Sequence, residues 1–390
     1  MSLAGLSGFR ADTKGIYERL ASLPEYPRGF RQGRGRRQTC EPEIKPVRPC
    51  IIHVGTHKTG TTSLQLFLDA NEDALRKGGL YLPRAGRPQE MAWGNHRLAW
   101  ELLVNGESED LRALLAELRE VSPVCAMLTA EDLSLLWARP DALVALAEGL
   151  ASVGYAPKIL MYLRPQAAYA ESMYVERIKQ GHLRPVAEYL EEVWTTGRYA
   201  QPGSAINIEF TYSRLIRPFV EAFGRENVLL RVFQPDGTRS GIFRDLIATI
   251  GSVFPEFATT PLRLSVPNPK ANESLTFREL LEAVYVHAHP GPEEADVVLS
   301  SLQARLIASG ADAALFNSRF ALFSRAEYGR FLDAFAGDNR EVEREYGVLV
   351  PFVDESGVPN AGDPRWPLAR VQREALDWLI SACLEARQRA

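Results

Sequence analysis

The sequence is short of cysteine, of long apolar runs and of net positive charge. Its four cysteines include no Cys-x-x-Cys pair, so neither a disulfide scaffold nor a zinc site is expected. No run of about 18 apolar residues occurs, and the N-terminus lacks the basic-then-apolar order of a secretory signal. A net charge of −4 excludes the broad basic field that nucleic-acid binding uses. We therefore expect a globular cytoplasmic protein with no transmembrane segment and no nucleic-acid partner.

The first 48 residues differ in composition from the rest of the chain. Residues 28–37 contain five arginines and three glycines, and no apolar period runs through them. A stretch of this kind is typical of a solvated linker. We interpret 1–48 as an Arg/Gly-rich N-terminal extension that is partly flexible.

From residue 50 onward, short apolar segments alternate with segments of helical period. The apolar segments predict strands at 50–55, 80–82, 124–129, 158–163 and 228–232. The helical periods predict helices at 62–78, 95–105, 108–121, 140–152, 166–180, 239–250, 273–288 and 370–385. This alternation indicates an α/β protein with a mainly parallel sheet and helices on both faces. We place the α/β core at 49–258, followed by a mostly helical C-terminal part at 259–390 that completes the domain and the acceptor site.

The most informative segment is 55–63, which follows the first strand and opens the first helix. It reads Gly-Thr-His-Lys-Thr-Gly-Thr-Thr-Ser. Glycines permit a tight turn, successive backbone N–H groups can converge on an anion, and the N-terminus of the helix adds a favourable partial charge. The segment therefore predicts a phosphate-binding loop.

The position of the lysine separates this loop from that of kinases and nucleotide triphosphatases. Their pattern places a lysine directly after the second glycine, next to the hydroxyl group that holds Mg²⁺. Here Gly55 and Gly60 match that pattern, but Thr61 takes the place of the lysine and Lys58 lies inside the loop. Only seven of the 45 cationic residues are lysines, and an ammonium group is a compact point charge. The loop is therefore expected to bind a diphosphate-like anion without requiring a metal.

The order Lys-Thr-Gly-Thr-Thr between a strand and a helix resembles the 5′-phosphosulfate loop of bacterial-type sulfotransferases that use 3′-phosphoadenosine 5′-phosphosulfate (PAPS). The resemblance implies PAPS as the sulfuryl donor, a P-loop sulfotransferase fold and no required metal. It also implies a catalytic role for Lys58, whose charge can stabilise the departing phosphate oxygen. The donor-binding residues that it implies in the loop are His57, Lys58, Thr59, Gly60, Thr61, Thr62 and Ser63.

A second match lies at the end of the strand expected at 158–163. Arg164 follows this strand, and Pro165 pushes it out of the helical region, so Arg164 is placed at the carboxyl edge where open α/β sheets bind ligands. Ser172 stands eight residues further on. Sulfotransferases of the resembled family bind the 3′-phosphate of the donor with an arginine and a serine at this spacing. The resemblance therefore implies that role for Arg164 and Ser172.

Transfer to a hydroxyl group also needs a residue that removes its proton. His96 stands at the start of the helix expected at 95–105, and an imidazole with an ordinary pKa of about 6.5 can accept a proton at neutral pH. Glu131 follows the strand at 124–129, where it can act as a base or bind the acceptor. The resembled family uses either residue type, so both alternatives stay open.

Together these residues predict a sulfotransferase that moves a sulfuryl group from PAPS to a hydroxyl or amine acceptor by in-line attack, with general-base assistance. The resemblance favours a saccharide or a glycolipid as the acceptor. Two alternatives stay open. One is a nucleotide-binding kinase or NTPase, and the other is a catalytically inert nucleotide-binding module that serves in interaction.

Overall fold

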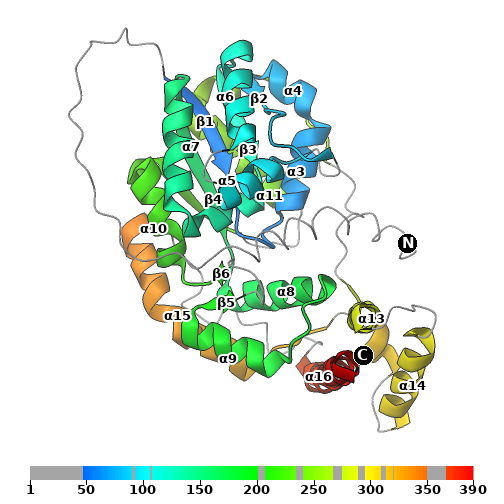
Figure 1. Cartoon of the computed structure of the whole chain (residues 1–390). Helices are drawn as coiled ribbons and strands as arrows, with labels where there is room; N and C mark the ends of the chain where they lie inside the picture. The colour runs from blue at the N-terminus through cyan, green and yellow to red at the C-terminus, as the bar shows by residue number, and fades with distance from the viewer. Residues whose placement is uncertain are drawn as a thin grey trace.

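The computed structural model describes residues 47–89, 93–105, 108–200, 207–233, 240–266, 275–288, 295–308, 313–318, 320–348 and 366–389. The extension expected over 1–48 lies outside these ranges except for its last two residues. One sheet has helices packed on both faces, and further helices lie beyond its carboxyl edge (Figure 1). No helix in the described ranges is both long and apolar enough to cross a membrane.

Five strands form the central sheet, in the order β2-β3-β1-β4-β7, and each neighbouring pair is parallel. Their bounds are β1 Arg48–His53, β2 Leu80–Tyr81, β3 Cys125–Thr129, β4 Tyr155–Leu163 and β7 Val228–Val232. The sequence pattern predicts a strand at each of these places, and the α/β class with a mainly parallel sheet is confirmed. In the register, His53 at the end of β1 lies opposite Thr129 of β3 and Leu160 of β4. The ends of the three central strands are therefore neighbours.

Several helices begin at residues that favour a helix start, either an N-cap side chain or a proline in the first turn. Ser108 accepts a hydrogen bond from the backbone N–H of Leu111 at the start of α6, Pro140 opens α7, and Ser324 with Glu327 forms a capping box on α15. The bounds are α3 Thr61–Ala70, α4 Glu72–Lys77, α5 His96–Asn105, α6 Glu109–Val121, η3 Glu131–Ala138, α7 Pro140–Ser152, α8 Gln166–Lys179, α9 Val186–Thr196, α10 Tyr212–Phe223, α11 Ser240–Val253, α12 Pro255–Ala258, α13 Phe277–Ala288, α14 Ala295–Ala308, α15 Arg325–Tyr346 and α16 Trp366–Arg389.

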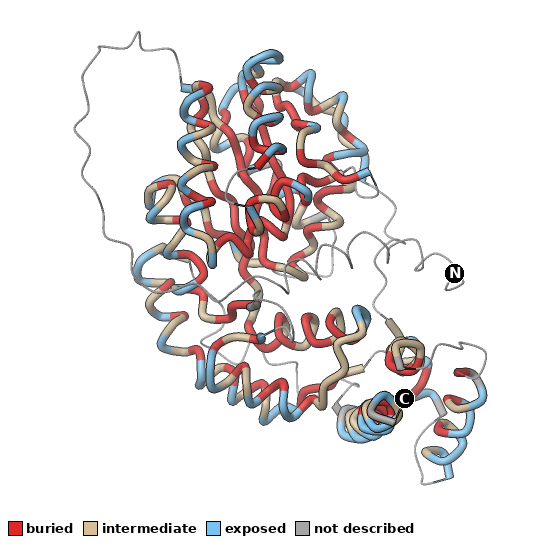
Figure 2. The backbone as a smooth tube through the Cα atoms, viewed as in Figure 1, coloured by how far each residue is buried: buried red, intermediate tan, exposed pale blue. Residues whose placement is uncertain are grey.

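Side chains of the central strands alternate between two apolar cores. Ile51 faces the core that contains side chains of α3, α4 and α11, whereas Cys50 and Ile52 face the core that contains side chains of α5, α6, α7 and α10. This is the period of two that a strand imposes, and both faces are apolar because helices cover both. Figure 2 shows the strands as the buried centre of the molecule. Because helices cover both faces of the sheet, a ligand can approach the strands only at their ends.

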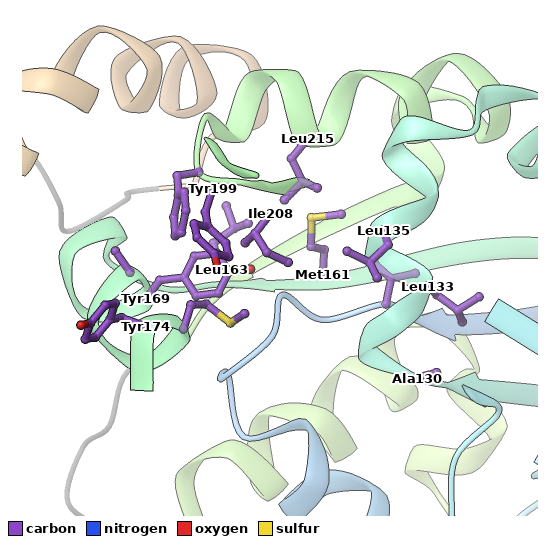
Figure 3. Close-up of a cluster of buried hydrophobic side chains, with 14 of the residues drawn as sticks. Ala130, Leu133, Leu135, Met161, Leu163, Tyr169, Tyr174, Tyr199, Ile208 and Leu215 are labelled. Atoms are coloured by element: carbon purple, nitrogen blue, oxygen red, sulfur yellow. The ribbon is translucent and has the colours of Figure 1, made fainter. Parts of the chain in front are cut away.

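The region beyond the carboxyl edge of the sheet contains α8, α9, α13, α15, α16 and a short hairpin, β5 Arg198–Ala200 with β6 Asn207–Glu209 (Figure 1). Apolar side chains join this region to the sheet. Tyr169 of α8, Tyr199 of β5 and Ile208 of β6 belong to the same buried cluster as Met161 and Leu163 of β4 (Figure 3). This packing holds α8 close to the end of β4.

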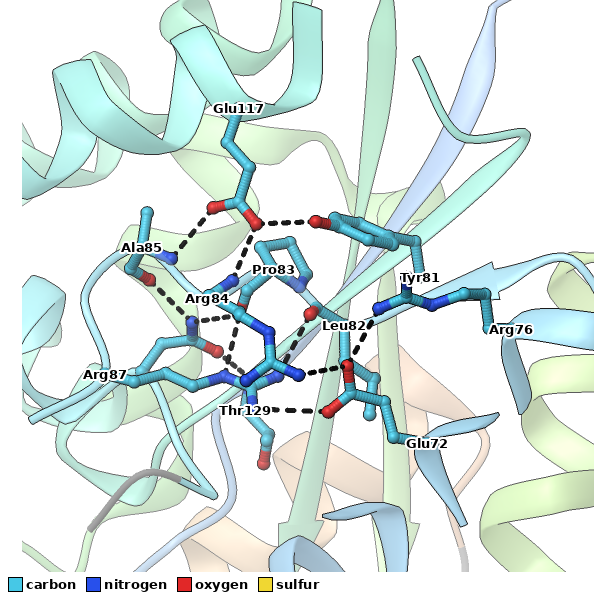
Figure 4. A network of polar contacts seen from close by, with 11 residues as sticks. Glu72, Arg76, Tyr81, Leu82, Pro83, Arg84, Ala85, Arg87, Glu117 and Thr129 are labelled. Atoms are coloured by element: carbon cyan, nitrogen blue, oxygen red, sulfur yellow. Dashed lines mark hydrogen bonds and ion pairs between the residues drawn. The ribbon is translucent and has the colours of Figure 1, made fainter. Parts of the chain in front are cut away.

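The loop after β2 is fixed by carboxylates on both sides. Glu117 of α6 accepts hydrogen bonds from the Tyr81 hydroxyl and from the backbone N–H groups of Arg84 and Ala85, each at 2.8 Å (Figure 4). Glu72 of α4 accepts a hydrogen bond from the Arg84 side chain at 3.0 Å. The loop that leads towards α5 is therefore tied to two helices.

A buried amide pair connects α8 with α15 and makes a prediction about stability. Gln166 donates to the Asn339 side-chain oxygen at 2.7 Å, and Asn339 donates back at 3.2 Å. Asn339→Ala should lower the free energy of unfolding by about 1–3 kcal/mol, because the buried Gln166 amide loses its partner. Urea denaturation measures this loss. Replacing both residues by leucine should cost less than the single change, and a single-variant loss below about 0.5 kcal/mol would contradict the role of the pair.

Candidate functional site

The loop between β1 and α3 turns through three residues with positive φ. These are Gly55 at +31°, Lys58 at +65° and Gly60 at +78°. Glycine adopts such values freely, whereas a lysine does so only under constraint. A Cβ atom on Gly60 would also lie 3.2 Å from both the Phe233 ring and the Ile242 side chain. The turn therefore depends on glycine at this position and holds Lys58 in a strained conformation, a feature that concentrates at functional sites.

Hydrogen bonds to β4 hold the base of this loop, residues 55–63. The backbone N–H and the hydroxyl of Thr56 donate to the carbonyl oxygen of Tyr162 at 3.2 and 3.0 Å. The Thr59 hydroxyl donates to the carbonyl oxygen of Thr56 at 2.6 Å. Thr56, Thr59 and Thr61 are buried, whereas Lys58 is half-buried. The three buried threonines therefore shape the 55–63 loop from inside.

The N-terminus of α3 carries no group that competes with an external anion. Gly60 is the N-cap residue and has no side chain, and no side-chain hydrogen bond caps the helix. The first turn, which holds Thr61, Thr62 and Ser63, contains no acidic residue. Helix N-termini favour negative charge, since their first N–H groups have no partner within the helix. The loop and the helix end can together bind a phosphate-like group.

Arg164 follows β4 and reaches the 55–63 loop. Its Nη1 donates to the main-chain carbonyl oxygen of Lys58 at 2.7 Å, so two residues predicted from separate segments are in contact. The Tyr212 hydroxyl of α10 hydrogen-bonds with both the backbone N–H and the carbonyl oxygen of Arg164. The guanidinium carbon lies 5.9 Å from the centre of the Phe233 ring. Burial lowers the pKa of Arg164, so a bound anion would favour its charged form.

Ser172 lies half-buried on α8, the helix next to Lys58. One turn further along this helix, Glu176 accepts a hydrogen bond from Lys58 Nζ at 3.2 Å. Residues four apart share a face of a helix, so Ser172 lies on the face of α8 that is turned towards the loop. Ser172 is therefore on the side of α8 that Lys58 contacts through Glu176.

Asp132, in the first turn of η3, connects three side chains. Its Oδ1 lies 3.2 Å from His57 Nε2, and its Oδ2 lies 3.0 Å from His96 Nδ1 and accepts from Trp100 Nε1 at 2.8 Å. Both Asp132 and His96 are buried. One carboxylate thus links the 55–63 loop to α5. His57, which the sequence analysis places among the donor-binding residues, makes its side-chain contact with this carboxylate.

Glu131 lies beside the other nitrogen of His96. Its Oε2 is 3.8 Å from His96 Nε2 and accepts from Gln65 Nε2 of α3 at 2.9 Å. The Glu131 side chain is 21% exposed, whereas that of His96 is 2% exposed. The two residues proposed as alternative bases are therefore neighbours, and Glu131 is the one that solvent reaches.

Burial and charge act in opposite directions on this cluster. Burial disfavours a charged His96, but the hydrogen bond with Asp132 and the charges of Glu131 and Asp132 outweigh it, so the pKa of His96 is raised. Burial also opposes ionisation of Asp132, yet its hydrogen bonds with His57 and His96 hold its pKa well below the usual range. Because an ionised carboxylate only accepts, we place the proton of His96 on Nδ1, which leaves Nε2 towards Glu131.

The position of His96 is set by the residues before it. The backbone N–H of Asn95 donates to the carbonyl oxygen of Thr129 at 2.8 Å, and the N–H of Thr129 donates to the Asn95 side chain at 3.1 Å. Asn95 also donates to the carbonyl oxygen of Ala85 at 2.8 Å. A Cβ atom on Gly94 would lie 2.7 Å from His96 Nε2, so the imidazole packs directly on that glycine. His96 is thus fixed at the end of β3.

His53 is a packed residue at the end of β1. Its side chain is fully buried, and Nδ1 lies 2.9 Å from the Thr129 hydroxyl. Burial lowers the pKa of His53 to about 4, so its imidazole is neutral at physiological pH.

Among the residues that the structure describes, no group of three or more His, Cys, Asp or Glu side chains is arranged to hold a metal ion.

The structure brings the predicted site residues into two adjoining groups. Lys58 and Arg164 meet at the loop, with Ser172 on the neighbouring side of α8, and His96 lies between Glu131 and Asp132. Three residues of the site are not predicted from the sequence: Asp132, Phe233 and Glu176. Asp132 carries a signal, because it directly follows Glu131 near a strand end. The other two become part of the site only through contacts between distant segments.

No family model and no curated protein matches this chain. Among solved structures, it is similar to a crystal structure of a sulfotransferase from Alicyclobacillus acidocaldarius, with 16% sequence identity and a TM-score of 0.31. The similarity covers 64% of this chain and 96% of the other. A likeness of this size carries no argument about function, which therefore has to be argued from the site itself.

Asp132→Asn should lower the pKa of His96, because burial still acts on the imidazole while the hydrogen bond with Asp132 and its charge are lost and only the charge of Glu131 remains. Titration of the imidazole by NMR measures this shift, and Asp141→Asn, an exposed carboxylate paired with Arg139, is the matched control. A raised native pKa stabilises the fold fully below about pH 6.5, and this contribution is lost as the pH rises through the native value. Asp132→Asn should weaken that pH dependence, because the pKa of His96 then lies nearer to or below its value in the unfolded chain. An unchanged pKa of His96 would contradict the account.

Proposed function

We propose that this protein is a sulfotransferase that takes its sulfuryl group from PAPS and transfers it to a hydroxyl group. The observation that carries the proposal is the hydrogen bond from Arg164 to the carbonyl oxygen of Lys58, which joins segments 106 residues apart. PAPS carries an anionic group at each end of its ribose, so its recognition needs two cationic positions within the length of one nucleotide. The contact of the Arg164 guanidinium with the main chain of Lys58 supports such a site, because it brings the two residues together at one loop.

Each part of the site suits one part of the donor. The backbone N–H groups of the 55–63 loop, the N-terminus of α3 and Lys58 would hold the phosphosulfate. Arg164 and Ser172 would hold the 3′-phosphate, for which a guanidinium is suited by its paired donors. Phe233, which lies next to Gly60 and Arg164, offers an aromatic face to the adenine. None of these contacts requires a metal.

In the proposed reaction, PAPS supplies the sulfuryl group. The acceptor oxygen forms a bond to sulfur while the bond from sulfur to the bridging phosphate oxygen breaks, and the hydroxyl proton passes to a base. Lys58 and the loop N–H groups stabilise the negative charge that develops on the phosphate oxygen. The backbone of the loop is held by the constrained conformation of Lys58 and by the hydrogen bond from Arg164, so its N–H groups would not have to reorganise for such stabilisation.

Glu131 and His96 would act as one proton-accepting unit. Glu131 is the more exposed of the two, so an acceptor hydroxyl would meet it first. His96 lies behind it with Nε2 at 3.8 Å, and Asp132 fixes the imidazole through Nδ1. The acceptor class itself, a saccharide or a glycolipid, stays a prediction from the family resemblance.

Adenosine 3′,5′-bisphosphate, the desulfated donor, should bind without Mg²⁺ and more tightly than ATP in isothermal titration calorimetry. Arg164→Ala should weaken this binding at least about tenfold, because a hydrogen bond to a charged group is worth about 1.5–3 kcal/mol. The affinity for AMP, which lacks the 3′-phosphate, should fall several-fold less, so AMP is the matched control ligand. Tighter, Mg²⁺-dependent binding of ATP would favour a kinase or NTPase, and an equal loss for both nucleotides would remove Arg164 from the 3′-phosphate.

Transfer of radiolabel from PAPS to a panel of saccharides, glycolipids and phenols tests the chemistry. His96→Ala and Glu131→Gln should each lower turnover by about 10²–10⁴ while nucleotide binding is retained, the range for loss of a general base. The double variant should be no slower than the slower single variant, since the two residues act as a unit. If the loss of turnover in the double variant equals the product of the two single losses, the two residues do not act as a unit. Normal turnover in either single variant would assign the base to the other residue.

A further inference from the structure

Lys58 is already engaged by a carboxylate in this structure. Its Nζ lies 3.2 Å from Glu176 Oε2 on α8. The same oxygen lies 3.1 Å from Nζ of Lys179, three residues further along the helix. Two of the seven lysines in the chain thus meet at one carboxylate. Glu176 stands where it competes with any anion for the lysine of the 55–63 loop.

The backbone of Lys58 is fixed, but its side chain can change partner. Its φ of +65° and the hydrogen bond from Arg164 to its carbonyl oxygen hold the main chain in place. The flexible four-carbon side chain can still move the ammonium group by changes in its torsions. The Lys58 and Glu176 side chains are 37% and 25% exposed. An ion pair of this exposure is weak enough to exchange.

Glu176 remains ionised at neutral pH. Burial acts to raise its pKa, but the charges of Lys58 and Lys179 and their hydrogen bonds lower it to about 2. Lys179 also matters after an exchange, because it can keep the carboxylate paired once Lys58 has moved away. Moving Lys58 therefore avoids the cost of leaving a partly buried carboxylate without a partner.

We propose that Glu176 holds the ammonium group of Lys58 until the anionic end of the nucleotide donor displaces it, while Lys179 keeps Glu176 paired. Glu176 is then a specificity-determining residue, since a ligand has to carry enough negative charge to take Lys58 from a carboxylate. This inference rests on the proposed function, because it takes the donor as the competing anion. It adds to that function a residue on α8 which opposes binding rather than supporting it.

Isothermal titration with adenosine 3′,5′-bisphosphate tests the exchange without an acceptor. Glu176→Gln keeps the shape of the side chain and removes its charge, and it should lower Kd about three- to fivefold, the range expected for a partly exposed ion pair. In a Lys58→Met background the same substitution should change Kd much less, because no lysine is left to release. Lys179→Met should raise Kd when Glu176 is present and have little effect together with Glu176→Gln.

The possible outcomes separate this inference from the function on which it rests. An equal Kd for wild type and Glu176→Gln, or the same fold change with and without Lys58→Met, would overturn the role of Glu176 and leave the nucleotide site standing. No binding of the bisphosphate to either protein would overturn the proposed function, and this inference with it. Glu176→Ala removes the same charge with a different side chain, and it should lower Kd in the same direction.

Discussion

The hydrogen bond from Arg164 to the carbonyl oxygen of Lys58 is the contact on which the site depends. It is possible because β1 and β4 are neighbouring parallel strands whose carboxyl ends stop at the same edge. Parallel pairing of this kind brings together residues that are far apart in the chain, which is why ligands of open α/β sheets bind there. The contact is made to Lys58 in a left-handed backbone conformation, which residues other than glycine adopt only rarely.

The charged groups around this contact are paired before any ligand is present. Glu176 engages Lys58, and Asp132 engages both His57 and His96. Pairing offsets the cost of burying charge, and it also fixes the direction of each group. In the function that we propose, binding of an anion would be an exchange of partners. The packing that holds α8 close to the end of β4 would then affect the affinity of the site as well as its shape.

The sequence predicts most of the α/β core, because apolar strands and amphipathic helices there have a clear period. It misses α9, α10, α12, α14, α15, β5 and β6, and it predicts one helix over 62–78 where α3 and α4 are separate. Pro218 stands inside α10 and breaks the helical signal, and the two hairpin strands are three residues each, too short to show alternation. In the site, the 55–63 loop and Arg164 follow from local patterns. The link through Asp132 and the pairing of Glu176 arise from tertiary contacts, to which no local pattern corresponds.

A crystal structure of the protein with adenosine 3′,5′-bisphosphate would test the central claim most directly, because the claim concerns one ligand that spans two cations. The account predicts the 5′-phosphate on the backbone N–H groups of the 55–63 loop and on Lys58, with the 3′-phosphate on Arg164. A nucleotide bound with only one of its phosphates in this region, or bound away from Arg164 altogether, would contradict it.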